Sequence, residues 1–85
     1  MSKYSFKLFV TGDNDRAMRA ITNLRKFGDE ELGGDYQLVV VDVLERPHEA
    51  EAHRIMATPT MIKENPLPVR RIIGDLADID LAMLG

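Results

Sequence analysis

Two histidines, His48 and His53, are the residues of this chain that come nearest to a catalytic metal site. They enclose a short acidic stretch, as the two histidines of a zinc-protease helix enclose a glutamate. That motif needs its histidines four residues apart, because only then do both side chains lie on one helix face. Here they are five residues apart, which separates them by about 140° around a helix of 3.6 residues per turn. We therefore predict a solvated helix face, with neither a metal nor a cofactor.

Thiol chemistry is excluded, because the sequence contains no cysteine. The turn at residues 11–14, Thr-Gly-Asp-Asn, offers a hydroxyl and a carboxylate but no base to activate the hydroxyl as a nucleophile. Two roles stay open for its backbone: to bind an anion, or to cap a helix that follows. No phosphate-binding loop motif is present in the sequence. These observations predict a protein that is not an enzyme.

Composition predicts one small soluble domain, residues 1–85, with a net charge of -3 and 45% hydrophobic residues. No apolar run approaches the roughly 18 residues of a membrane-spanning helix. The first residues lack the apolar core of a signal peptide, so we expect a cytoplasmic protein with no membrane partner. The mildly acidic balance argues against nucleic acid as a partner.

The first half of the chain predicts a strand, a helix and a second strand. Residues 6–10 are rich in strand formers, and Asn14 or Asp15 is a suitable helix N-cap. The helix ends at Gly28 or at the glycine pair 33–34, and its apolar residues share one face: Ala17, Ala20, Ile21, Leu24 and Phe27. Residues 38–43 form an almost continuous apolar run, which predicts a strand buried on both faces of a parallel sheet. The three elements make a right-handed βαβ unit.

The second half predicts a short helix, two strands and a last helix. Pro47 suits the first turn of a helix over residues 47–55. Strands follow at about residues 60–63 and 69–73, and Asp75 caps a helix that runs to residue 84. The resulting order, β-α-β-α-β-β-α, is that of an α/β thioredoxin-like fold.

The segment 57–60, Ala-Thr-Pro-Thr, fits that fold, because thioredoxin-like proteins place a cis-proline beside their active site. Without the cysteine pair that belongs opposite Pro59, we expect this end of the molecule to serve recognition. Pro66 and Pro68 follow closely. The three prolines mark turns or form a conformational gate, since isomerisation at proline takes tens to hundreds of seconds.

Arginines provide the other candidate binding residues. Arg70 and Arg71 are neighbours on a predicted strand, so one of them points toward the interior side. Either it pairs with Asp42 or Asp75, or the two arginines dock a partner. A stripe on the first helix has the same two interpretations, a solvated face or a surface for an acidic partner, and contains Arg16, Arg19, Asn23 and Lys26.

Several segments together resemble the KaiB family of circadian-clock proteins. They are residues 7–12, 19–20, 41–44 with Pro47, 57–60, and above all the long block 66–76, Pro-Leu-Pro-Val-Arg-Arg-Ile-Ile-Gly-Asp-Leu. The resemblance implies a protein without enzymatic activity that binds the KaiC ATPase ring. It further implies KaiA, or a sensor kinase of SasA or CikA type, as additional partners. A SasA-type recognition domain with a single fold is the alternative.

The resemblance also implies two folds for one sequence. About residues 1–46 stay fixed, and about residues 47–85 change between the thioredoxin-like form and a β-α-β-β-α-α-β ground state that self-associates as a dimer or tetramer. Family chains continue past the position of Gly85, so we expect this chain to favour the thioredoxin-like form and to tetramerise less.

The family's functional positions correspond to two sets of residues here. Partner binding is implied for Arg19, Gln37, Arg46, His48 and Arg54. The conformational switch is implied for Pro59, Pro66, Pro68, Arg70, Arg71, Gly74 and Asp75.

Overall fold

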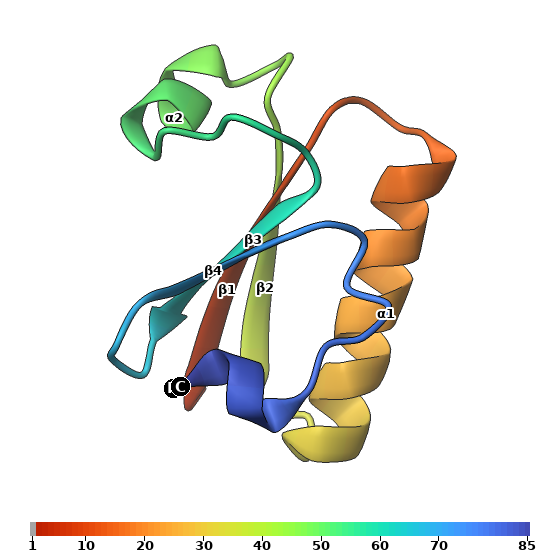
Figure 1. Ribbon diagram of the computed structural model, residues 1–85, viewed down its shortest axis with the longest axis vertical. Helices are drawn as coiled ribbons and strands as arrows, with labels where there is room; N and C mark the ends of the chain where they lie inside the picture. Colours follow the sequence, from red (N-terminus) through yellow and green to blue (C-terminus); the bar gives the residue numbers. More distant parts are fainter. Residues whose placement is uncertain (1) are drawn as a thin grey trace.

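A four-stranded sheet organises the computed structural model, which describes residues 2–85 (Figure 1). Its strand order is β2-β1-β3-β4, with β1 parallel to β2 and antiparallel to β3, and with β4 antiparallel to β3. The elements in chain order are β1 (Tyr4–Val10), α1 (Asp15–Glu31), β2 (Tyr36–Asp42), α2 (Pro47–Ala52), β3 (Thr60–Asn65), β4 (Arg70–Ile73) and the 3-10 turn η1 (Leu81–Leu84). This order confirms the predicted thioredoxin-like arrangement. No helix within residues 2–85 is long and apolar enough to cross a membrane.

The long helix α1 covers one face of the sheet (Figure 1). It starts at Asn14, whose side-chain oxygen accepts a hydrogen bond of 2.9 Å from the Ala17 amide. This cap confirms the predicted start of the helix. The predicted apolar face is buried against the sheet at Ala17, Ala20, Leu24 and Phe27.

Of the two predicted ends for α1, the structure selects the glycine pair 33–34. The helix continues through Gly28, and the amide of Gly34 donates to the Gly28 carbonyl at 2.9 Å. Gly28 allows a close approach instead, because a β-carbon at this position would lie 2.4 Å from the Tyr36 ring. The absence of a side chain at Gly28 therefore sets the distance between α1 and the first residue of β2.

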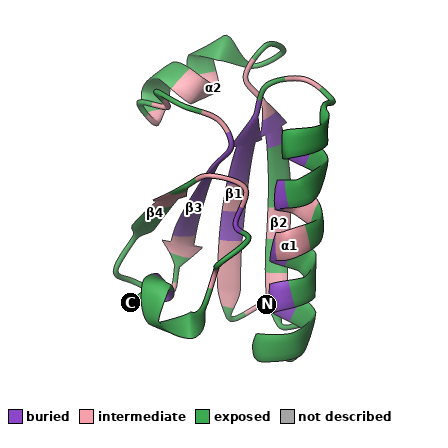
Figure 2. Cartoon of the chain, turned by 45° about the vertical axis from the view of Figure 1, so that its right-hand side comes forward, coloured by how far each residue is buried: buried purple, intermediate pink, exposed green. Residues whose placement is uncertain are grey.

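The prediction that residues 38–43 form a strand buried on both faces is wrong. Within β2 only Val41 is buried, whereas Val39 and Val40 are 52% and 40% exposed. The strand lies at the edge of the sheet. On the face of the sheet opposite α1, α2 covers only one end of this strand (Figures 1 and 2). A continuous apolar run does not distinguish a central strand from an edge strand.

The predicted last helix, residues 75–84, is reduced to the single turn η1. Gly74 and Leu76 have φ angles of 120° and 66°, which a right-handed helix does not allow. The Leu76 side chain is buried in the core instead, and Asp80 caps η1 in place of the predicted Asp75. The segment after β4 thus crosses the α1 side of the sheet as an irregular chain.

The loop before β3 places the expected cis-proline near the start of α1. The Thr58–Pro59 bond is cis, as the thioredoxin-like interpretation predicted, and the bonds before Pro66 and Pro68 are also cis. The hydroxyl groups of Thr58 and Thr11 are 2.6 Å apart, so this loop contacts the turn that follows β1. That turn is where a thioredoxin would carry its cysteines.

Candidate protein-interaction site

The short helix α2 gathers three of the five predicted partner-binding residues at one end of the molecule. Arg46 immediately precedes the helix, His48 lies in its first turn, and Arg54 follows its end. All three side chains are exposed. We call the surface formed by Arg46, His48 and Arg54 the α2 surface.

Polar contacts with the backbone hold the end of α2. The Arg71 guanidinium donates to the carbonyl groups of His53 and Arg54, at 2.6 and 3.2 Å. The His53 ring nitrogen Nδ1 lies 2.9 Å from the Glu49 carbonyl, and the ring packs 5.2 Å from the Phe9 ring. His53 is therefore half-buried support for the helix, and only His48 lies on the exposed face.

Of the two interpretations of Arg70 and Arg71, the structure does not support the pairing with Asp42 or Asp75. Both arginines are exposed, because β4 is an edge strand, and Arg71 binds carbonyl groups of the α2 end. Asp75 instead forms an ion pair of 3.6 Å with Arg19. The alternation of side chains along a strand shows that Arg70 and Arg71 point to opposite faces of the sheet. It does not show which of the two faces α2 covers.

Asp42 closes the turn that sequence analysis left open to anion binding. Its carboxylate accepts hydrogen bonds from the amides of Gly12 and Leu44, at 3.1 and 2.9 Å. The turn at residues 11–14 thus has a carboxylate on the Gly12 amide and the Asn14 helix cap beside it. This arrangement favours the structural role of the turn.

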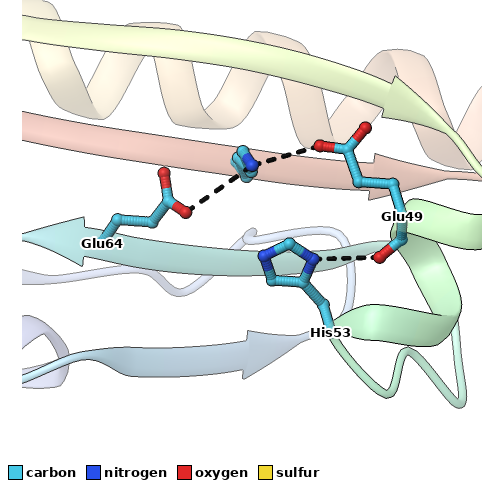
Figure 3. Close-up of polar contacts among 4 residues, drawn as sticks. Glu49, His53 and Glu64 are labelled. Carbon is cyan, nitrogen blue, oxygen red and sulfur yellow. Dashed lines mark hydrogen bonds and ion pairs between the residues drawn. The ribbon is translucent and has the colours of Figure 1, made fainter.

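A charged cluster on the open face of the sheet was not identified from the sequence (Figure 3). The Lys7 amino group lies 3.1 Å from Glu49 of α2 and 3.7 Å from Glu64 of β3. Since Phe6 and Leu8 are both buried against α1, the alternation of β1 directs Lys7 to the opposite face. A lysine between two buried apolar residues was the signal that this face is only partly covered.

A groove of about 460 Å³ separates α2 from the loops beside it. Met56, which is 93% exposed, lines this groove. Ile55 also lines it and packs against the buried cluster that contains Phe9. Its lining is mainly apolar and small: Thr11, Val43, Pro47, Ala50, Glu51, Ile55, Met56, Ala57 and Thr58. The groove adjoins the α2 surface and could receive an apolar side chain of a docked partner.

The other two predicted partner-binding residues lie elsewhere. Gln37 is exposed near the start of β2, at the end of the strand remote from α2 (Figure 1). Arg19 is on α1, on the opposite face of the sheet, where it pairs with Asp75. The structure therefore divides the five residues among three surfaces.

Among the titratable groups of residues 2–85, Lys63 is the one whose protonation the structure clearly changes. It is 2% exposed, and burial together with the nearby Arg70 charge lowers the pKa of its amino group. The amino group donates to the Leu84 carbonyl, so the C-terminal segment covers it. Among residues 2–85 no three histidine, cysteine or acidic side chains are placed to hold a metal ion.

The fold and this site define a thioredoxin-like domain without thiol chemistry. Two solved structures share the fold: the N-terminal domain of Synechococcus elongatus SasA (TM-score 0.74, 20% identity, 88% of this chain and 71% of that one) and mitochondrial thioredoxin 3 from Saccharomyces cerevisiae (TM-score 0.70, 21% identity, 88% and 70%). At these identities the likeness concerns the fold alone.

The sequence defines the family. The KaiB domain signature matches residues 7–85, so the chain belongs to the KaiB domain family. It is 41% identical over 85 residues to circadian clock protein KaiB3 of Synechocystis sp., covering all of this chain and 83% of that protein. It is 49% identical over 82 residues to the circadian clock oscillator protein KaiB of Prochlorococcus marinus strain MIT 9313, covering 96% and 69%.

Proposed function

We propose that this protein is a non-enzymatic component of a circadian clock or timer that binds a KaiC-type ATPase ring and modulates its phosphorylation cycle. The observation that carries the proposal is membership of the KaiB family over residues 7–85, with relatives that are named circadian clock proteins. Absence of cysteine removes the redox chemistry of other thioredoxin-like proteins and agrees with a binding role.

The α2 surface is the proposed docking site for the ring. Arg46, His48 and Arg54 are exposed at one end of the molecule, beside the groove that contains Met56. An interface with an exposed methionine and arginines around it has the composition of a protein-binding centre. We assign Gln37, on the outer edge of β2, to a separate downstream partner such as KaiA or a sensor kinase.

Binding to the recombinant KaiC-type ring of the same organism tests the proposal, with and without ADP and with incubation for hours. We expect a complex, and we expect the double variant Arg46→Glu, Arg54→Glu to weaken it by about tenfold or more. Arg25→Glu, on the exposed side of α1, changes charge in the same way and should leave the affinity unchanged. Absence of a complex after hours, or equal weakening by Arg25→Glu, would contradict the assignment.

A slow fold change in about residues 47–85 is the second part of the proposal. Family resemblance supports it, and the conformation described here is the thioredoxin-like member of the pair. The switch residues Pro59, Pro66, Pro68, Arg70, Arg71, Gly74 and Asp75 all lie in or beside β3 and β4. Regulation would then depend on how much of the chain is in the binding-competent form.

A SasA-type recognition domain with one fold is the competing function, favoured by the likeness to the SasA N-terminal domain. Amide NMR distinguishes the two. One set of resonances under all conditions, with no slow exchange in residues 47–85, supports the single-fold domain. A second, slowly exchanging set confined to that half supports the fold switch.

A further inference from the structure

The outer edge of β4 is an exposed strand edge at the opposite side of the sheet from β2. β4 pairs with β3 on its inner side, and within residues 2–85 no strand lies on its outer side (Figure 2). Ile73 of this strand is 65% exposed, and Val69, directly before it, is 53% exposed. An exposed apolar strand edge is a template for pairing with another chain.

The hydrogen bonds between β3 and β4 show which backbone N–H and C=O groups of β4 can pair with an added strand. The Gly74 amide donates to the Pro59 carbonyl at 2.9 Å, so Gly74 faces β3. Because consecutive residues of an antiparallel strand face alternate sides, Ile72 also faces β3, and Arg71 and Ile73 direct their N–H and C=O groups outward. These two residues offer the spacing that an added strand requires.

Positive charge surrounds this edge. Arg70 and Arg71 are exposed and lie on opposite faces of the sheet, as neighbours on a strand must. The ion pairs found among residues 2–85 involve Lys7 and Arg19, and none involves either β4 arginine. The charge of Arg70 also contributes to the lowered pKa of Lys63, after burial.

We propose that the outer edge of β4 binds an extended acidic segment of a partner protein as a fifth, antiparallel strand. Two consecutive acidic side chains would lie beside the arginines, one on each face of the sheet, and two apolar side chains beside the isoleucines. The partner segment thus reads apolar, apolar, acidic, acidic from its N-terminus. The site adjoins the end of α2, where the Arg71 guanidinium donates to the carbonyl groups of His53 and Arg54, but the proposal does not require the proposed ring binding.

A second copy of the chain fits this edge poorly. Because only Arg71 and Ile73 direct their backbone groups outward, two β4 strands can pair about a twofold axis centred on Arg71 or on Ile72, which places Arg71 opposite a second Arg71 or opposite Ile73. Both pairings bring the four β4 arginines of the two copies onto adjacent strands, and like charges on facing strands destabilise a sheet. An acidic segment removes that repulsion.

Titration of the ¹⁵N-labelled chain with a blocked hexapeptide, Ser-Val-Ile-Glu-Asp-Ser, tests the proposal without any variant. We expect saturable shifts of the Arg71 and Ile73 amides, slower hydrogen exchange at both, and weaker binding as the salt concentration rises. A peptide with two lysines in place of the acidic residues should bind about fivefold more weakly or worse. No shift in residues 69–74 at millimolar peptide, or equal binding of the lysine peptide, would overturn the proposal.

Matched variants locate the site. Arg70→Glu should weaken the acidic peptide about fivefold, whereas Arg25→Glu on α1 should have no effect. Shifts centred on residues 36–42 would assign the peptide to the β2 edge and overturn the proposal. Concentration-dependent shifts of β4 in the absence of peptide would assign the edge to a second copy, with the same consequence.

Discussion

Lys63 is the residue whose chemical state depends most on the rest of the fold. Its side chain is buried on the α1 side of β3, where a charged amino group loses hydration. The Leu84 carbonyl compensates in part by accepting its hydrogen bond. The burial of this lysine has no signal in the sequence, because the segment that covers it is irregular and follows no hydrophobic period.

Alkaline pH should therefore affect stability through Lys63. Its pKa is lowered in the folded state, by burial first and then by Arg70, from 10.5. Between the lowered value and 10.5 the unfolded chain holds more protons, so the free energy of unfolding should rise with pH in that window. At lower pH the folded protein bears the full cost of the buried charge.

Urea unfolding of the wild-type chain and of Lys63→Met, from pH 7 to pH 10.5, measures this effect as a difference between the two curves. We expect the free energy of unfolding of the wild type to rise relative to that of the variant as pH increases. Contributions from all other titratable groups cancel in the difference. Arg70→Gln should reduce the gain by removing the second cause of the lowered pKa. Parallel curves for the wild type and Lys63→Met would show that the amino group is not desolvated.

Among the elements, the contact between α1 and β2 depends on one glycine. Gly28 costs helix stability of about 1 kcal/mol relative to alanine. A β-carbon there would approach the Tyr36 ring to 2.4 Å, far inside van der Waals contact. Forced overpacking of this kind usually costs about 1–3 kcal/mol, so the clash should exceed the gain in helix propensity.

Gly28→Ala should consequently destabilise the protein by about 1 kcal/mol in denaturant unfolding. In a Tyr36→Ala background the same substitution should change sign and stabilise by up to about 1 kcal/mol, because only the propensity term remains. The double-mutant cycle isolates the contact from the general effect of losing the tyrosine. Equal effects in both backgrounds would mean that Tyr36 moves aside at no cost.

Element order could be predicted from the sequence, because capping residues, periodicity and turn residues are local signals. The βαβ unit, the Asn14 cap and Pro47 at the first turn of α2 follow from such signals and are confirmed. Exposure of β2 and the short η1 could not be predicted in this way. The first depends on how much of the sheet α2 covers, and the second on positive φ angles at Gly74 and Leu76.

The candidate site was predictable to a smaller extent. The family resemblance supplied Arg46, His48 and Arg54, which the structure places together around α2. It also supplied Arg19 and Gln37, which lie on two other surfaces. Contacts between elements distant in sequence, such as Arg71 with the end of α2 and Lys7 with Glu49, follow only from tertiary packing.

For the whole molecule, the two halves contribute unequally to the core. The main cluster consists chiefly of residues from β1 and α1, together with Met61 of β3. After β4 only Leu76 and Leu84 are buried in it. The C-terminal segment is therefore attached through few apolar contacts, the hydrogen bond from Lys63 and the contacts of Asp75 with Arg19 and Asn23, as expected of a part that can rearrange while the remainder persists.

Leu84 is the residue at which this asymmetry can be tested. It is 4% exposed, whereas Leu81 in the same turn is 49% exposed. Leu84→Ala should cost about 2–4 kcal/mol of local stability, which corresponds to a population of rearranged chains larger by at least about thirtyfold. The loss should fall on residues 47–85, because β1, α1 and β2 keep most of their own core contacts.

Amide NMR of Leu84→Ala and of Leu81→Ala measures that population directly. In the first variant, resonances of residues 47–85 should lose intensity to a second set while those of residues 2–46 stay in place, and the second variant should match the wild type. Helical shifts across residues 61–73 in the new set would identify the β-α-β-β-α-α-β form. If residues 2–46 change together with the rest, the chain unfolds as one unit, and its first half is not a fixed support for a switch.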